Sequence, residues 1–201
     1  ILRDHYEDTF LEGPYFNPSS PDFLTVCMHN SPAGFTWGNT ASSCITILPD
    51  CEDQLAVMWW APVVPCCSLY LPIYVEAGEL PECLTKAGTY GKTMCAPSDV
   101  KSQDTYKEGS FWWEMRSLLD LINGDEIGSS YNQRHGVVRT MFDQLETRWL
   151  VEAKKVEARA IAMKKDGKPE EMAKILSAFT ARCMDEALET IQAAKNLIAG
   201  M

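Results

Sequence analysis

The second half of the chain carries apolar residues at the spacing of an α-helix. One such stripe begins near Tyr106 and predicts a helix that ends at Asn123-Gly124, because Gly readily adopts the left-handed conformation that closes a helix. We expect this helix to bury one face in a core. The apolar positions are Phe111, Met115, Leu118, Leu119 and Ile122.

Two longer stripes follow. A helix is predicted from about Tyr131 to Asp166-Gly167, and Pro169 fits the first turn of a further helix. The short Asp-Gly-Lys link makes these two helices an antiparallel hairpin. We interpret both stripes as core packing, although docking of the hairpin on a second copy, giving a homo-oligomer, is an open alternative. The stripes comprise Val138, Met141, Leu145, Trp149, Ala153, Val156 and Ala160, and then Met172, Ile175, Phe179, Cys183, Ala187, Ile191 and Ala194.

The first half has the texture of a β-sheet. Residues 23–28, 41–48 and 54–60 are short runs rich in β-branched or aromatic residues, bounded by Asn, Pro, Gly or Asp, which predicts three strands. In the run 41–48 apolar residues occupy both alternating sets of positions, which favours a strand covered on both faces. Strands followed by helices indicate an α+β fold. We predict one domain, strand-rich over 1–100 and helical over 101–201.

Composition and charge exclude several classes of function. The 201 residues include 28 acidic and 18 basic side chains, a formal net charge of −10, whereas nucleic-acid binding relies on Lys and Arg. The longest mainly apolar run, 55–74, is interrupted by three prolines, so the sequence predicts no membrane partner and a soluble chain. Ile1 is followed at once by charged residues without a signal-peptide pattern, which suggests a chain cut from a longer precursor.

Eight cysteines raise the question of metal or disulfide chemistry. They form no C-x-x-C pair, and the three histidines (His5, His29 and His135) are scattered, so the spacing predicts no metal site and no cofactor. Buried free thiols are the expected state, with one or two disulfides left open. Nucleotide-binding, zincin and G-x-S-x-G nucleophile motifs are also lacking in the sequence.

Polar chemistry concentrates between Thr25 and Tyr74. The stretch Trp37-Gly38-Asn39-Thr40-Ala41-Ser42-Ser43 places an amide and small hydroxyls where a strand begins. Asn39 could therefore support a developing oxyanion, with Thr40, Ser42 and His29 lining a pocket. The structural alternative is that Asn39 and Thr40 cap a turn through backbone hydrogen bonds.

Five segments together resemble a known family. Residues 2–9, Leu-Arg-Asp-His-Tyr-Glu-Asp-Thr, are similar to the R-D-H-Y-E-G-T signature of the bacterial dipeptidase A family, with Asp8 where that family usually has Gly. Cys27-Met28-His29 also resembles the related secernins. The similarity covers most of residues 1–150. The other segments in that family's order are Thr40-Ala41-Ser42-Ser43, the Trp59 strand, the turn Tyr70-x-Pro72-x-Tyr74, and Phe111-Trp112-Trp113.

The resemblance implies an N-terminal-nucleophile hydrolase with stacked αββα layers, acting on dipeptides or other small amides. In that family the nucleophile is a Cys at the mature N-terminus, whereas residue 1 here is Ile. We therefore expect this chain to be the C-terminal part, and the nucleophilic Cys to lie on another segment or chain of the same enzyme. A non-catalytic interaction or regulatory protein of the secernin kind, and an acylase on non-peptide amides, are the alternatives.

The same resemblance gives residues 3–9 a place near the site. Arg3, Asp4 and His5 are expected to form a polar cluster that shapes the substrate pocket, with a structural ion pair as the alternative. Trp59 and Trp60 are expected in the core. Catalytic support is thus assigned to Asn39, and substrate binding to His29, Thr40, Ser42, Arg3 and His5.

Overall fold

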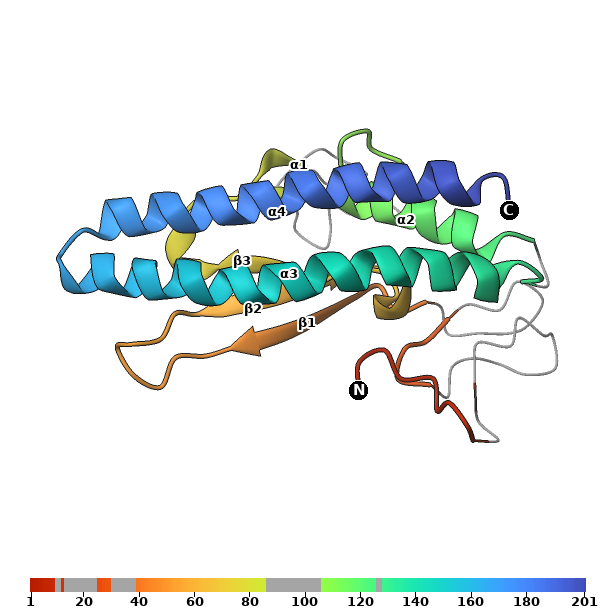
Figure 1. Cartoon of the computed structure of the whole chain (residues 1–201), viewed down its shortest axis with the longest axis horizontal. Helices are drawn as coiled ribbons and strands as arrows, with labels where there is room; N and C mark the ends of the chain where they lie inside the picture. Colours follow the sequence, from red (N-terminus) through yellow and green to blue (C-terminus); the bar gives the residue numbers. More distant parts are fainter. Residues whose placement is uncertain (10–11, 13–24, 30–38, 86–105, 126–127) are drawn as a thin grey trace, which may run out of the picture.

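The computed structural model describes residues 1–9, 12, 25–29, 39–85, 106–125 and 128–201, and its strands precede its long helices (Figure 1). This order confirms the predicted α+β class. Among the described residues, no helix combines the length and apolar character needed to cross a bilayer. The elements are β1 (Ser42–Ile47), β2 (Val57–Pro62), a 3-10 turn (Pro65–Cys67), β3 (Leu71–Tyr74), a second 3-10 turn (Val75–Ala77), α1 (Glu82–Thr85), α2 (Phe111–Asn123), α3 (Tyr131–Lys165) and α4 (Pro169–Ile198).

The three strands form an antiparallel sheet in the order β1-β2-β3. Cys44 is paired with Trp60, and Trp60 with Leu71, which fixes the register across the sheet. Pro72 is tolerated because β3 is an edge strand, and the hydroxyl of Thr180 in α4 donates a hydrogen bond of 2.9 Å to its carbonyl. The α3–α4 hairpin therefore covers the β3 edge, and β1 is the strand farthest from it (Figure 1).

Strand prediction was correct for β1 and β2 and wrong elsewhere. Residues 25–27 form bends and residue 28 is irregular, in place of the expected strand. The reason is that backbone groups of Cys27 and Met28 bond to the irregular segment at Asp4 and to Thr40 instead of a neighbouring strand. Residues 23 and 24 of that prediction lie outside the described residues. Residues 71–74 were expected as a turn and form β3.

β1 is the open edge of the described sheet. All its side chains except Ser43 are exposed, and Ile45 and Ile47 retain 47 % and 48 % exposure. The predicted cover on both faces of this strand is thus wrong for the described part of the chain, since the helices pack along β3 and leave β1 projecting. Bare apolar edges of this kind are usually covered in natural proteins.

The long helices agree with their predicted boundaries except at the start of α2. α2 starts at Phe111, five positions after the expected Tyr106, and α3 and α4 begin at Tyr131 and Pro169 as expected. Gly167, with φ 72°, closes α3: its N–H bonds to the carbonyl of Lys164 at 3.1 Å, and that of Lys168 bonds to Met163 at 2.9 Å. This pair of bonds is a Schellman motif, which reverses the chain into α4.

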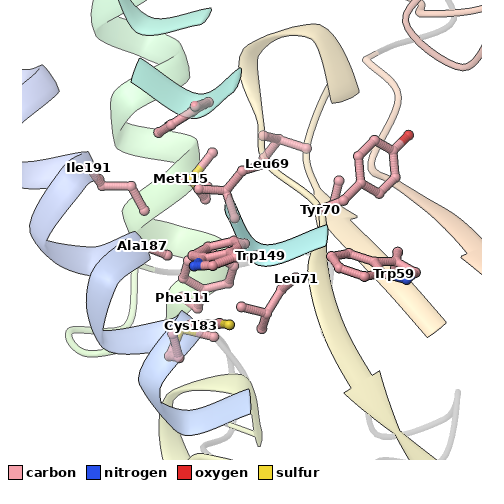
Figure 2. Packing of buried hydrophobic residues seen from close by; sticks show 14 of the residues in the cluster. Trp59, Leu69, Tyr70, Leu71, Phe111, Met115, Trp149, Cys183, Ala187 and Ile191 are labelled. Atoms are coloured by element: carbon pink, nitrogen blue, oxygen red, sulfur yellow. The ribbon is translucent and has the colours of Figure 1, made fainter. Parts of the chain in front are cut away.

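Most of the predicted stripe residues lie in one core between the hairpin, α2 and the sheet. Trp149 of α3 is fully buried near the centre of this cluster, with Cys183 and Ala187 on one side and Leu71 and Trp59 on the other (Figure 2). Trp59 is in the core, and Trp60 is partly buried with its ring centroid 6.1 Å from that of Phe111. The expectation of a core position is confirmed for Trp59, whereas Trp60 packs against the core from a partly buried position.

Candidate functional site

Four metal-ligating side chains from three separate segments meet in the interior. His5 belongs to the N-terminal segment, Cys27 and His29 to the bend region, and Cys66 to the 3-10 turn after β2. Their ligand atoms all lie within 4.8 Å of one another. Exposure is 6 % for His5, 0 % for Cys27, 1 % for His29 and 3 % for Cys66, so water has little access. We call these four residues the His–Cys cluster.

His29 lies at the centre of the cluster. Its Nε2 is 3.2 Å from Nε2 of His5, 3.0 Å from Sγ of Cys66 and 3.7 Å from Sγ of Cys27. The rings of His5 and His29 are tilted, with centroids 5.1 Å apart. Two imidazole nitrogens and two thiols thus point at one small volume.

A carboxylate fixes the orientation of His5. Oε1 of Glu7 lies 3.4 Å from Nδ1 of His5, while Oε2 accepts a hydrogen bond of 3.2 Å from the His5 backbone N–H. Because Nδ1 faces the carboxylate, Nε2 is left to face the cluster. Glu7 itself is exposed, with 57 % of its side chain accessible.

Backbone bonds to distant residues hold the bend that carries Cys27 and His29. The N–H of Cys27 donates to the carbonyl of Asp4 at 3.1 Å. Met28 is bonded twice to Thr40: its N–H donates to the Thr40 hydroxyl at 3.0 Å, and its carbonyl accepts from the Thr40 N–H at 2.9 Å. These bonds clamp the bend between the N-terminal segment and the start of β1.

The turn that carries Cys66 is held from α3. The Cys66 carbonyl lies 3.2 Å from Nε2 of His135 and accepts a longer contact of 3.4 Å from Arg139. Nearby Val63 has φ 54°, which is rare and strained for a β-branched residue and turns the chain sharply out of β2. Sγ of the adjacent Cys67 is 3.6 Å from that of Cys66, and the hydroxyl of Tyr131 is 3.6 Å from both.

The environment separates the three neighbouring thiols. Burial alone would raise the pKa of Cys66, but hydrogen bonds from Cys27 and Cys67 and the charge of His29 hold that pKa well below its usual range. The hydrogen bond to Cys66 together with burial raises the pKa of Cys27, and burial together with Cys66 raises that of Cys67. The cluster therefore favours one thiolate, at Cys66, accepting hydrogen bonds from neutral neighbours.

An ion-pair network lies beside the cluster. Glu146 of α3 accepts hydrogen bonds from Arg3 at 2.5 and 3.0 Å, from Arg139 at 3.2 Å and from the Tyr70 N–H at 2.7 Å. Arg3 also donates to the carbonyl of Pro65 at 2.8 Å. The network ties the N-terminal segment to the turn and to α3, which matches the structural alternative for Arg3.

The sequence-predicted site residues do not share one pocket. His5 and His29 meet in the interior, whereas Ser42 is exposed at the start of β1 and Arg3 points to Glu146. Thr40 supports the bend through its bonds to Met28, and Asn39, the residue before Thr40, is partly exposed. Trp37 and Gly38 of the same motif lie outside the described residues.

Sequence reasoning did not single out Cys66, Cys67, Tyr131 and His135. One local signal was available: Cys27 and His29 form a C-x-H pair, and both residues face the same cluster. Among the thiols that the structure describes, Cys27, Cys66, Cys67 and Cys183 are buried as expected, whereas Cys44 and Cys51 are exposed. Cys95 lies outside the described residues.

The cluster offers thiolate and imidazole ligands in a closed space, which suits the binding of a soft or borderline cation better than turnover of a substrate.

The family resemblance was compared with family models, curated proteins and solved structures. The chain matches no family model, no curated protein and no solved structure, so its resemblance to dipeptidase A stays a prediction.

Proposed function

We propose that this chain is the C-terminal part of a cysteine-type N-terminal-nucleophile amide hydrolase that cleaves dipeptides. Its nucleophilic Cys would lie on another segment or chain of the same enzyme. In the complete enzyme the thiolate of this Cys attacks the amide carbon, and the α-amine of the same Cys transfers the proton to the leaving nitrogen. Water then hydrolyses the acyl-enzyme and releases the acyl product. The part described here would complete the αββα layers and position the site.

The observation that carries this proposal is that the family-like segments contact one another in the fold. His5 of residues 2–9 lies against His29 of the secernin-like segment, and Met28 of that segment is bonded to Thr40 at the start of the next one. The indole N–H of Trp112, in the last segment, donates to the carbonyl of Ala41 at 3.2 Å. An alignment of these segments with one family fold requires contacts of this kind, and in this sense they support the proposal.

A departure from the family signature has a backbone explanation. Asp8 replaces the usual Gly, and its φ is 62°, in the left-handed region that Gly adopts most easily and Asp tolerates better than most residues. The position thus keeps the conformation for which a Gly would be chosen. This agreement supports the alignment of residues 3–9 with the signature.

The open edge at β1 supports the placement of a further layer. Ile45 lies beside Tyr70 and Leu2 around a surface depression, and it is half-exposed. In a sandwich of two sheets this surface would be covered by the rest of the enzyme. The partner surface is therefore assigned to β1 and this depression.

The test is made on the full-length natural protein that contains this chain. We expect the native preparation to contain a polypeptide or segment that begins with Cys, detected by intact mass, and to hydrolyse dipeptides until thiols are alkylated. Because Cys44 and Cys51 are exposed and would also react, the assay is repeated with both replaced by Ser. Retained hydrolysis after complete alkylation would exclude the thiol mechanism.

A matched pair of variants tests the role of β1. Ile45→Glu should reduce both association with the remaining enzyme and dipeptide hydrolysis by at least about tenfold, because a charge would be buried without a partner. Val151→Glu is the control, since Val151 on α3 is similarly exposed at 55 % against 47 % for Ile45. Equal activity of the two variants would argue against docking at β1.

Cleavage of N-acyl amino acids but not dipeptides by the full-length protein would point to the acylase alternative.

A further inference from the structure

We propose that His5, Cys27, His29 and Cys66 bind a zinc ion that fastens the irregular N-terminal segments to the folded core. The histidines and cysteines are scattered along the sequence, and for this reason spacing predicted no metal site. The fold brings four of them together from three segments. This proposal is independent of the hydrolase proposal.

The separations between ligand atoms fit a tetrahedral ion. With Zn–N bonds of about 2.0–2.1 Å and Zn–S bonds of about 2.3 Å, neighbouring ligand atoms lie roughly 3.3–3.8 Å apart. In the His–Cys cluster the N···N distance is 3.2 Å and the two N···S distances from His29 are 3.0 and 3.7 Å. These three separations lie close to the tetrahedral values, and all the ligand atoms lie within 4.8 Å of one another, so shifts of the side chains would close the coordination shell.

Hydrogen bonding alone serves this arrangement poorly. Nε2 of His29 faces one nitrogen and two sulfurs, yet a neutral imidazole nitrogen has either one N–H or one lone pair. It can satisfy one of its three neighbours at a time. An ion at the common centre satisfies all four groups at once, with each lone pair directed to the metal.

The charge of the site also suits zinc in a buried place. Two thiolates and two neutral imidazoles carry a charge of −2, which a divalent cation neutralises, so no net charge is buried. Both sulfurs are thiolates when they hold the ion, so any thiol proton still present is released on binding. Thiolate and imidazole ligands disfavour Mg²⁺ and Ca²⁺, which prefer oxygen.

The second layer around the cluster resembles that of metal sites. Glu7 contacts the Nδ1 of His5, so that carboxylate, imidazole and ion would follow one another as in many zinc proteins. Cys67, whose thiol lies 3.6 Å from Cys66, could donate a hydrogen bond to the metal-bound sulfur. With four protein ligands and at most 6 % exposure, the site is closed, which indicates a structural rather than a catalytic ion.

The test measures metal binding by the whole 201-residue chain. We expect the protein purified without chelator to contain about one equivalent of zinc by elemental analysis. After removal of the metal, titration with Co²⁺ alone should give the visible d–d bands of tetrahedral coordination and a thiolate-to-cobalt charge-transfer band. Added Zn²⁺ should remove both bands.

Variants identify the ligands. Cys66→Ser and Cys27→Ser should abolish the charge-transfer band or reduce its intensity by about half, because each removes one of two thiolates. Cys183→Ser is the matched control, since this thiol is equally buried but lies outside the cluster, and it should bind cobalt as the wild type does. Cys67→Ser should also bind cobalt, because Cys67 is not one of the four proposed ligands.

If the ligand variants fail to fold, Glu7→Gln keeps the proposal testable. Glu7 is exposed and not a ligand, so the variant should fold and bind zinc about 10–100-fold more weakly. The proposal is overturned if the wild type binds neither Zn²⁺ nor Co²⁺, or if Cys27→Ser and Cys66→Ser bind them like the control. The proposal would also be overturned if peptide mapping found a disulfide between Cys27 and Cys66 in protein prepared in reducing buffer.

Discussion

A Trp149→Ala variant should lose about 3–5 kcal/mol of the free energy of unfolding, because it removes the largest fully buried side chain of the core. The substitution leaves a cavity between α3, α4 and the sheet. It also removes the indole N–H that donates to Glu186 at 2.7 Å. Urea unfolding at fixed pH and metal concentration measures the change.

Two companion variants separate these contributions. Trp149→Phe keeps most of the buried ring and should cost about 1–3 kcal/mol, mainly through the hydrogen bond to a charged acceptor. Glu186 would retain Arg148 at 2.8 Å and Arg182 at 2.9 Å as partners. Leu150→Ala is the control on the same helix, 51 % exposed, and should stay within about 0.5 kcal/mol of the wild type. If Trp149→Ala lost less free energy of unfolding than Trp149→Phe, the result would contradict the central position of this ring in the core.

Glu146→Gln should destabilise the protein by about 2–4 kcal/mol, because it removes one charge from between two arginines. The carboxylate is 12 % exposed, and Arg3 and Arg139 have 28 % and 15 % of their side chains accessible. An amide places N–H groups opposite one guanidinium, so at least one pair of donors would face each other. We expect the loss of free energy of unfolding to be smaller than for a fully buried ion pair, because water still reaches Arg3.

Salt and a second variant distinguish this network from surface ion pairs. Asp143 also pairs with Arg139, at 2.8 Å, but it is 59 % exposed. Asp143→Asn should therefore cost no more than about 0.5 kcal/mol, and less at high salt. The Glu146→Gln loss should persist at high salt. Equal effects of the two variants would show that burial of the network contributes nothing.

The helices were predictable because their signals are local. The stripe spacing, the Asn-Gly and Asp-Gly stops and Pro169 each act within one or two turns. α2 and α3 end within a residue or two of their stops, and α4 begins at Pro169. The strands were less predictable. Residues 25–28 have strand-like composition but are drawn into bonds with Asp4 and Thr40, which no local pattern encodes.

The candidate site was predictable only in part. His29 was singled out as a residue lining a pocket, and His5 through the resemblance of residues 3–9, and the two side chains do meet. Cys66 was not, since its approach depends on the sharp turn at Val63 and on its anchoring by His135 and Arg139 of α3. Interactions between residues far apart in the sequence decide the cluster, and a single sequence gives no direct measure of them.

The Schellman closure at Gly167 also has a consequence for the order of folding. Because only a short link joins α3 and α4, the hairpin closes a small loop and its contacts are local, so it should form early as a cooperative unit. The N-terminal segments depend on contacts between distant residues and should join last. Native-state hydrogen exchange would then show helical amides such as that of Met184 opening only on global unfolding, while the amide of Cys27 exchanges through a smaller, local opening.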